Sequence, residues 1–319
     1  MRAPAYATKP PRHLLSLAHL DAAEIEAIVD RAVEHASGLR QPSAPLLGKI
    51  IGLYFRKTST RTRTSFAVAT LKLGGSTLLY GANDLQIETG ETYEDTGRVL
   101  SGYLDGLVIR TAGPQTEMCD LAKQNTMPVI NAMSSHEHPA QALADLATLK
   151  TRFGALEGLR ILYVGEGNNT ASALAYALSR IRGVYFELLT PPGFALPDSI
   201  LTECDLLARQ HGAAIQARES IDKLPSCVDA VYTTRWLTTG VTRTDPNWRD
   251  VFRPFSVTPA MMDRVSKPSG TVFMHDLPAI RGEEVDDAVL DGPQSIAFQQ
   301  ARFKLFSAMA ALEWCLCGF

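Results

Sequence analysis

The stretch that decides the fold is KIIGLYFRKTSTRTRTSFAVATLKLGG, residues 49–75. Its first seven residues, 49–55, form a short apolar run, which is typical of a strand buried in a sheet. A polar loop follows, and Ser65 to Leu73 then has the pattern of a helix that ends at Gly74-Gly75. The stretch therefore predicts a strand, a loop and a helix in succession, which is the repeating unit of a parallel sheet.

The same alternation extends through the first half of the chain. Further strands are predicted at 106–109 and 127–130, and helices at 21–35, 116–124 and 139–150. Asp21 is placed to cap the first of these helices. Strands that alternate with helices predict a parallel sheet that is covered on both faces.

A second alternating series begins near residue 159. Its predicted strands are 160–164, 186–189, 230–232 and 271–274, and its predicted helices are 171–181 and 200–211. The expected fold class is α/β, with two doubly wound domains that each hold a parallel sheet with helices on both faces. We place the domains at residues 1–150 and 151–298, and we assign the apolar final helix, 299–319, to the first domain.

Composition limits the classes of function. The chain has 319 residues and a mass of 34.7 kDa, which suits two domains, and 45% of its residues are hydrophobic. Its 31 basic and 34 acidic residues give a net charge of −3, which excludes a broad surface for nucleic acid.

Targeting and metal-binding signals are also missing from the sequence. No run has the length of a membrane span, and the first residues lack the apolar block of a signal peptide. The five cysteines are scattered, and no histidine cluster completes a zinc site. We expect a cytoplasmic protein that has reduced cysteines, binds no metal and does not enter a membrane.

Polar side chains are dense in the loop of the first strand-to-helix unit. Ser59 to Arg63 contains three hydroxyls and two guanidiniums. Backbone amides and the helix dipole at the start of a helix favour an anion, and the Arg61 guanidinium fits a phosphate in two places at once. The loop therefore predicts a phosphate site rather than a merely solvated segment.

A second polar group lies at the head of the helix 139–150. His138 and Gln141 are three residues apart and share one face at the helix start. A histidine there is more often a cap, but together with the amide it can polarise a carbonyl oxygen. Arg110 follows the strand 106–109 and is expected in the crevice where open α/β sheets bind ligands. These three residues are candidate catalytic groups.

These motifs resemble those of the transcarbamylases, the family of aspartate and ornithine carbamoyltransferases. The two signatures are Ser59-Thr60-Arg61-Thr62-Arg63 and His138-Pro139-x-Gln141-x-Leu143-Ala144-Asp145-Leu146, and the resemblance runs from about residue 12 to the C-terminus. It implies an enzyme that moves the carbamoyl group of carbamoyl phosphate to an amino-acid amine without a cofactor or metal. It also implies a homotrimer with shared active sites.

The resemblance assigns roles to single residues. It places the phosphate on Ser59, Thr60, Arg61 and Thr62, and the carbamoyl group on Arg110, His138 and Gln141. Arg302 fits the family's C-terminal arginine, which also reaches carbamoyl phosphate, and Gln86 matches a loop residue that relatives lend to the neighbouring subunit. Hydrogen bonds to the carbamoyl oxygen from Thr62, Arg110 and His138 would stabilise the charge that builds as the amine attacks.

The second half of the chain is expected to bind the amine, and it departs there from the ornithine branch. Asn169 and Leu277 match that branch, whereas Asp276 stands where the branch has cysteine. Thr234 replaces an aspartate that steadies the ornithine amine, and Thr238-Thr239 replaces Ser-Met.

Arg235 resembles instead an arginine of the aspartate branch that contacts a substrate carboxylate. We therefore hypothesise that the acceptor is not ornithine but a small diamino or acidic amino acid. In this hypothesis Arg235 binds a carboxylate, and Asp276 lies near an amine, which it orients or deprotonates. The alternative is that the acceptor remains ornithine and the product is citrulline.

Two alternative hypotheses, each from a different class of protein function, stay open. The Gly-x-Gly-x-x-Thr turn at 165–170, with Glu187 twenty residues after Gly167, is a weak match to an NAD-dependent Rossmann dehydrogenase. The second alternative is a non-catalytic relative of the transcarbamylases that binds carbamoyl phosphate. The dehydrogenase reading leaves the two polar groups at 59–63 and 138–141 without a role.

Overall fold

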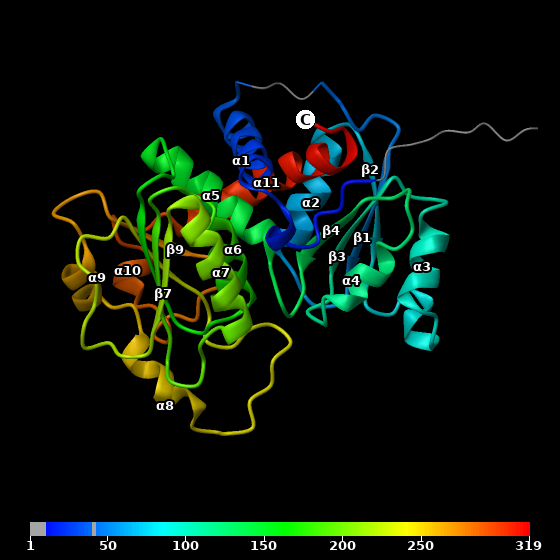
Figure 1. Ribbon diagram of the computed structural model, residues 1–319. Coiled ribbons are helices and arrows are strands. Elements are labelled where there is room, and N and C mark those ends of the chain that lie inside the picture. The colour runs from blue at the N-terminus through cyan, green and yellow to red at the C-terminus, as the bar shows by residue number, and fades with distance from the viewer. Residues whose placement is uncertain (1–10, 40–42) are drawn as a thin grey trace, which may run out of the picture.

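Two parallel sheets stand side by side in the computed structural model, which describes residues 11–39 and 43–319 (Figure 1). The first sheet has the strand order β2-β1-β3-β4. Its strands are β1 (Ile50–Phe55), β2 (Ser76–Tyr80), β3 (Gly106–Arg110) and β4 (Val129–Met133). Its helices are α1 (Ala22–Ser37), α2 (Arg61–Lys72), α3 (Tyr93–Leu100), α4 (Thr116–Leu121) and α5 (Pro139–Phe153).

Helices cover both faces of the first sheet. Ile51 and Leu53 of β1 belong to a core shared with α1, α2 and α5, whereas Tyr54 packs with residues of α3 and α4. Successive side chains of a strand point to opposite faces, so this division places one helix layer on each side.

The second sheet has the strand order β7-β6-β5-β8-β9 and is also parallel throughout. Its strands are β5 (Arg160–Val164), β6 (Tyr185–Leu189), β7 (Ala214–Arg218), β8 (Ala230–Thr233) and β9 (Val272–His275). Its helices are α6 (Asn169–Leu178), α7 (Asp198–His211), α8 (Trp248–Phe252), α9 (Pro259–Val265) and α10 (Asp287–Leu290). Tyr163 of β5 faces the core with α5 and α6, and Leu162 faces the core with α9 and α10.

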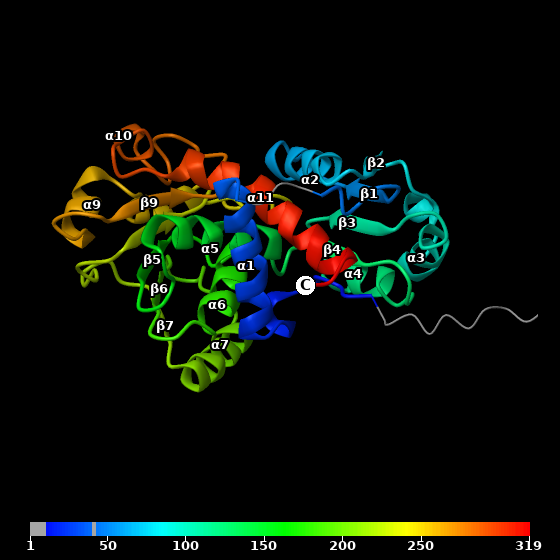
Figure 2. The same ribbon diagram turned by 90° about the horizontal axis from the view of Figure 1, so that it is seen from above.

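The last helix, α11 (Ala297–Leu316), crosses the junction between the two halves together with α1 (Figure 2). It packs against α1, α2 and α5 and also touches β9. Short 3₁₀ helices lie at η1 (Leu17–His19), η2 (Gln86–Thr89) and η3 (Arg253–Phe255). Because α5 continues to Phe153, the predicted limit between residues 150 and 151 falls inside a helix, and the division into domains stays a prediction.

The predicted fold class is confirmed. All the predicted strands are present within one to three residues, and Asp21 caps α1 by accepting a hydrogen bond from the Glu24 amide at 2.8 Å. The sequence analysis did not predict β2, β7, α3 or the short helices α8, α9 and α10. The part of the chain described by the structure contains no helix long and apolar enough to cross a bilayer. Within the same residues, no three His, Cys, Asp or Glu side chains gather as metal ligands.

Candidate active site

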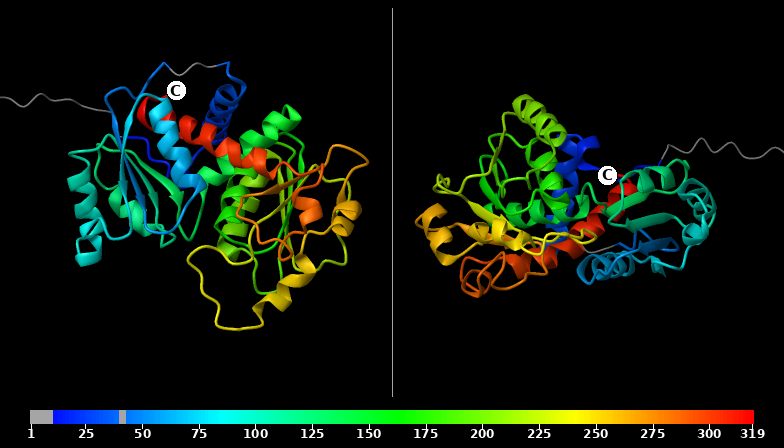
Figure 3. Two further views of the ribbon diagram at one scale, coloured as in Figure 1. Left: turned by 180° about the vertical axis from the view of Figure 1, so that it is seen from behind. Right: turned by 90° about the horizontal axis from the view of Figure 1, so that it is seen from below.

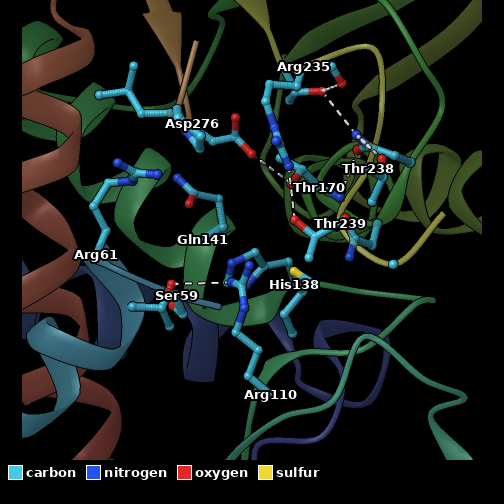
Figure 4. Close-up of a pocket in the computed structure, with 18 of the residues that line it drawn as sticks. Ser59, Arg61, Arg110, His138, Gln141, Thr170, Arg235, Thr238, Thr239 and Asp276 are labelled. Carbon is cyan, nitrogen blue, oxygen red and sulfur yellow. Dashed lines mark hydrogen bonds between the residues drawn. The ribbon is translucent and has the colours of Figure 1, made fainter. Parts of the chain in front are cut away.

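The carboxyl ends of strands from both sheets open onto one cavity of about 360 Å³. Its lining comes from the loop between β1 and α2, the ends of β3, β4 and β9, the start of α5, the turns after β5 and β8, and α11 (Figure 4). Crevices at this edge of parallel sheets are where α/β proteins bind ligands. The cavity is therefore the candidate active site.

The loop before α2 and the first two residues of the helix supply Thr58 to Thr62 to the lining. Helix α2 begins at Arg61, and its N-cap residue Thr60 makes no capping hydrogen bond through its side chain. The Ser59 hydroxyl accepts a hydrogen bond from the Arg63 amide at 3.3 Å. Because Thr60 does not cap the helix, the amides of Arg61 and Thr62 keep the capacity to bind an anion, and the helix dipole adds to that preference.

Two arginines face this loop. Arg110, at the end of β3, donates from Nη1 to the Thr62 hydroxyl at 3.5 Å, and its buried Nε has no partner among the described residues. Burial lowers the pKa of Arg61, and it lowers that of Arg110 to about 10, with Arg61 and Arg235 as nearby cations that add to the effect. Both arginines remain charged at neutral pH, so this part of the cavity favours an anion.

His138 and Gln141 lie at the start of α5, as the sequence predicted. Burial holds the pKa of His138 well below its ordinary value, and the cations Lys304 and Arg110 lower it further. The imidazole is therefore neutral at physiological pH, and its buried Nδ1 has no hydrogen-bond partner in the described structure. Gln141 Nε2 donates to Asp145 Oδ1 at 2.8 Å. Figure 4 shows the two side chains beside the same space as Arg61 and Arg110.

Lys304 of α11 is a lining residue that the sequence analysis missed. Its amine donates a short hydrogen bond to Gln141 Oε1, and burial lowers its pKa. Arg302, which was predicted to reach the ligand, is exposed, lies over the ring of Phe306 and does not line the cavity. Residues two positions apart on a helix point about 200° apart, so Arg302 and Lys304 cannot face the same side. The placement does not support the role predicted for Arg302.

A buried network beneath Gln141 joins the two halves of the molecule. Besides Gln141, Asp145 accepts hydrogen bonds from Gln300 Nε2 at 2.7 Å and from the Tyr232 hydroxyl at 3.0 Å. Gln300 Oε1 in turn accepts one from the His275 amide at 2.9 Å. These bonds fix α5, α11, β8 and β9 relative to one another at the floor of the cavity.

The turn after β5 links both halves at the rim. Asn169 Nδ2 donates to the Ser134 carbonyl at 2.7 Å, and the His138 amide donates to the Asn169 carbonyl at 3.1 Å. Asn168, which was not predicted, donates from Nδ2 to the hydroxyls of Thr234 at 2.9 Å and Thr238 at 3.1 Å. The turn therefore positions both the start of α5 and the loop after β8.

The glycine pattern of this turn has a packing explanation. A Cβ at Gly167 would lie 2.4 Å from the Leu196 amide nitrogen, so the close backbone contact alone requires glycine. Glu187, the acidic residue of the dehydrogenase reading, is buried and paired with Arg218 at 2.9 Å. Neither feature supports a dinucleotide site.

The loop after β8 carries four predicted residues to the cavity: Thr234, Arg235, Thr238 and Thr239. Thr234 is only 2% exposed, and its hydroxyl also lies 3.2 Å from that of Tyr163. Arg235 Nη2 donates to the Thr239 hydroxyl at 2.9 Å. Figure 4 shows Arg235 and Asp276 across the cavity from Arg110. Arg235 is thus held in place by its own loop.

Asp276, just after β9, is the one carboxylate among the described lining residues. It accepts a hydrogen bond from the Thr170 hydroxyl at 3.3 Å. Burial raises its pKa, while His275, Lys304 and Arg235 oppose that rise. Against Asp276 stand the cations Arg61, Arg110, Arg235 and Lys304. The cavity therefore suits an anionic ligand and offers one negatively charged position for an amine.

The structure brings nearly all the predicted residues together. Those that line the cavity are Ser59, Thr60, Arg61, Thr62, Arg110, His138, Gln141, Asn169, Thr234, Arg235, Thr238, Thr239, Asp276 and Leu277. Gln86 does not; it is exposed at the start of η2 and accepts a hydrogen bond from the Thr89 hydroxyl at 2.6 Å. Its role in a neighbouring subunit stays a prediction.

Comparisons with known proteins agree on one family. Residues 12–151 match the model "Aspartate/ornithine carbamoyltransferase, carbamoyl-P binding domain", and residues 157–315 match "Aspartate/ornithine carbamoyltransferase, Asp/Orn binding domain". The chain is 37% identical over 305 residues to the ornithine carbamoyltransferase of Oceanobacillus iheyensis, covering 94% of this chain and 93% of that relative.

Solved structures give the same result. The ornithine carbamoyltransferase from Pyrococcus furiosus is similar with a TM-score of 0.90 and 37% identity, covering 97% of this chain and 98% of that one. The enzyme of the same name from Gloeobacter violaceus has a TM-score of 0.85 and 34% identity, covering 97% of this chain and all of the other.

Proposed function

Because the chain belongs to the aspartate/ornithine carbamoyltransferase family, we propose that it transfers the carbamoyl group of carbamoyl phosphate to a small amino acid other than ornithine. The carbamoyltransferase activity follows from the family. The acceptor is the part that this proposal adds. The observation that carries it is the set of charged residues where the acceptor is expected. Relative to the ornithine branch, a carboxylate is missing at Thr234, and Arg235 and Asp276 add a cation and a carboxylate.

The phosphate of the donor is proposed to lie at the start of α2. Ser59, Thr60, Arg61 and Thr62 line the cavity at the start of α2, where the N-cap residue Thr60 makes no side-chain capping bond, which supports an anion there. Arg61 supplies a fork of N–H donors that matches phosphate oxygens. As the C–O bond to phosphate breaks, the charge on the leaving group rises, and these fixed donors stabilise it.

The carbamoyl group is proposed to lie between Arg110, His138 and Gln141. Arg110 and neutral His138 have N–H donors for the carbamoyl oxygen, and the Thr62 hydroxyl is beside Arg110. Gln141 Oε1 accepts from Lys304 and has a second lone pair for the carbamoyl NH₂. When the amine attacks the carbon, negative charge develops on the oxygen that these donors face, which lowers the barrier.

Lys304 is proposed to act in this site in place of Arg302. Its amine bonds the Gln141 oxygen, which fixes the orientation of the amide. Its charge also balances the negative charge of a bound donor. This assignment replaces the role that the sequence analysis gave to Arg302.

The acceptor is proposed to bind between Arg235 and Asp276. Thr234 has no carboxylate, and its hydroxyl is already engaged by Asn168 and Tyr163, so it has little to offer a distant ammonium group. Arg235 suits a carboxylate of the substrate, and Asp276 suits an amine. Burial raises the pKa of Asp276, which favours a role in accepting the proton that the amine loses.

An assay of phosphate release against a panel of amines tests the proposal. Ornithine, shorter diamino acids, aspartate and glutamate are compared by kcat/KM, and products are identified by mass spectrometry. We expect a shorter diamino acid or an acidic amino acid to exceed ornithine by at least about tenfold. Rapid citrulline formation with no better acceptor would establish the alternative, which the names of the similar proteins favour.

A double variant provides the second arm. Asp276→Cys with Thr234→Asp restores the residues expected in the ornithine branch, so activity with ornithine should rise relative to the preferred acceptor. The single variants serve as controls, because each restores only one of the two positions. A double variant that folds, binds phosphate and gains no activity with ornithine contradicts the proposed roles of both positions.

A further inference from the structure

The loop between β8 and α8 carries Arg235, one of the two proposed acceptor contacts, and has no regular structure. It runs through 234–247 and is the yellow segment that leads into α8 in Figure 3. Residues 237–241 line the cavity together with Thr234 and Arg235. Ordering such a loop costs conformational entropy, so contacts that order it before the substrate arrives strengthen binding.

Two residues outside the cavity lining, Arg243 within the loop and Glu166 in the turn after β5, hold this loop in place. Arg243 Nη2 donates to Glu166 Oε1 at 2.6 Å and to the Trp236 carbonyl at 3.1 Å. The other oxygen of Glu166 accepts from the Thr238 hydroxyl at 2.8 Å. Glu166 lies in the turn after β5, so one carboxylate bonds both the middle and the far end of the loop to the second sheet.

Aromatic rings enclose the guanidinium of Arg243. Its central carbon lies 4.5 Å from the ring centre of Phe194, 4.8 Å from that of Trp248 and 5.2 Å from that of Phe252. The Arg243 and Glu166 side chains are only 12% and 13% exposed, so their attraction is weakly screened by water. The planar fork of arginine can lie against the rings and bond a carboxylate and a carbonyl at once, which a lysine cannot do.

We infer that Arg243 and Glu166 are positioning residues that order the acceptor loop and thereby set the affinity for the amino-acid substrate. The inference rests on the proposed function, because that function places the acceptor at Arg235. Neither residue is part of the described cavity lining, and the side-chain hydrogen bonds of the pair go to Thr238 and Trp236 of the loop, not to the start of α2 or α5. Loss of the pair should therefore weaken acceptor binding and leave the binding of carbamoyl phosphate unchanged.

Steady-state kinetics of Arg243→Met test the inference on the full chain. With the preferred acceptor of the panel, we expect its KM to rise at least about tenfold, while the KM for carbamoyl phosphate stays within about twofold. Arg243→Lys, which keeps the charge but not the fork, should be intermediate. An equal rise in both KM values, or no rise in either, overturns the inference.

Limited digestion with trypsin measures the loop without any acceptor. Because Glu166 holds the wild-type loop at Thr238 and Arg243, cleavage after Arg235 should be slow, and it should be faster in Arg243→Met and Glu166→Gln. If no amine in the panel is a substrate, the proposed function is rejected. The digestion would still test whether Arg243 and Glu166 order the loop. Unchanged cleavage in both variants overturns the inference, and so does faster cleavage with an unchanged acceptor KM.

Arg249→Met is the matched control. Arg249 also lies over the Trp248 ring, at 4.5 Å, and forms an ion pair with Glu283 at 3.0 Å, but its hydrogen bond is to Glu283 rather than to the acceptor loop. It therefore removes a guanidinium from the same aromatic cluster and should change neither the acceptor KM nor the cleavage after Arg235. A rise in acceptor KM equal to that of Arg243→Met would assign the effect to the cluster as a whole and overturn the specific role of Arg243.

Discussion

Glu137, next to His138, is a fully buried carboxylate outside the cavity lining. Its Oε1 accepts from the Leu17 amide at 2.7 Å, and its Oε2 accepts a short hydrogen bond from the Ser16 hydroxyl. Burial raises its pKa from 4.5 to about 7, although both hydrogen bonds and Arg180 oppose the rise. The residue ties η1 to the segment that precedes the candidate catalytic histidine.

This raised pKa predicts how stability depends on pH. Between about pH 4.5 and 7 the folded state holds a proton on Glu137 that the unfolded state has lost, so the free energy of unfolding falls as the pH rises. Relative to Glu137→Gln, which cannot titrate, the wild type should lose on the order of 3 kcal/mol across this range. Urea unfolding of both proteins at pH 5 and pH 8 gives the difference.

An exposed glutamate provides the control for that measurement. Glu157→Gln removes a carboxylate at the surface and should follow the wild-type pH dependence closely. The prediction fails if the free energy of unfolding of Glu137→Gln differs from that of the wild type by the same amount at pH 5 and at pH 8. The carboxylate would then not take up a proton on folding.

At the same scale, Arg302 and Lys304 show why the sequence located the site but not every side chain in it. Motifs such as 59–63 fix their own geometry, because neighbouring residues at a strand-to-helix turn must face one edge of the sheet. A single residue on a long helix has no such constraint. An assignment that is wrong by two positions selects a residue that faces solvent instead of the cavity. The available signal was physical: Lys304 stands within a mostly apolar stretch, where burial of an amine requires partners.

At the scale of elements, two of the four edge strands, β2 and β7, were missed, whereas the fully buried edge strands β4 and β9 were predicted. β1 and β3 are buried along almost their whole length, so each is a continuous apolar run in the sequence. β2 and β7 pair on one side only and are half exposed, and their sequences STLLY and AIQAR mix polar and apolar residues without a clear period. An apolar run therefore predicts a buried strand, at an edge or in the centre, more readily than it predicts a half-exposed strand.

The packing of α3 against α4 leads to a prediction at this scale. A Cβ at Gly97 of α3 would lie 2.6 Å from the carbonyl oxygen and 3.0 Å from the Cα of Leu121, both backbone atoms of α4. Alanine usually stabilises a helix interior by about 1 kcal/mol relative to glycine. Here the overlap forces backbone to move, at a cost of about 1–3 kcal/mol or more, so Gly97→Ala should destabilise the protein.

Thermal unfolding of two glycine variants checks that prediction. Gly102→Ala adds a Cβ whose nearest neighbour is the Val99 carbonyl oxygen at 3.4 Å, which is an ordinary contact, so its Tm should stay near that of the wild type. Gly97→Ala should have the lower Tm of the two. A Tm for Gly97→Ala equal to or above that of the wild type would mean that α3 and α4 are not packed as closely as described.

At the scale of the whole molecule, the cavity depends on contacts that no local pattern contains. Its phosphate side comes from the first sheet and its acceptor side from the second, and the two are held by α11 and by the network around Asp145. Each sheet could be predicted from alternating runs of residues. The relative position of the sheets could not, because Asp145 and Gln300 are 155 residues apart and meet only in the folded chain.

The homotrimer stays a prediction, and exposed apolar side chains on the first half of the molecule are candidates for its interfaces. Large apolar side chains are exposed on α2, β2 and α3 and just after α3, at Leu71, Leu78, Leu79, Val99 and Tyr103. Exposed apolar side chains are commonly covered at protein interfaces, and the family resemblance implies three subunits. We therefore predict a particle of three times the 34.7 kDa chain mass in light scattering, and a smaller particle for Leu79→Lys.

Subunit mixing decides whether Gln86 belongs to a neighbouring active site. Arg61 lines the cavity of its own chain and Gln86 does not, so in a trimer with shared sites the two residues of one site come from different chains. Arg61→Ala and Gln86→Ala should each be nearly inactive alone. When equal amounts are unfolded and refolded together, about one site in four combines an intact Arg61 with an intact Gln86, and activity should recover toward that fraction. If Gln86 acts within its own chain, or only at the surface, mixing restores no activity beyond the sum of the separate variants. Recovery of activity requires that residues of two subunits complete one cavity.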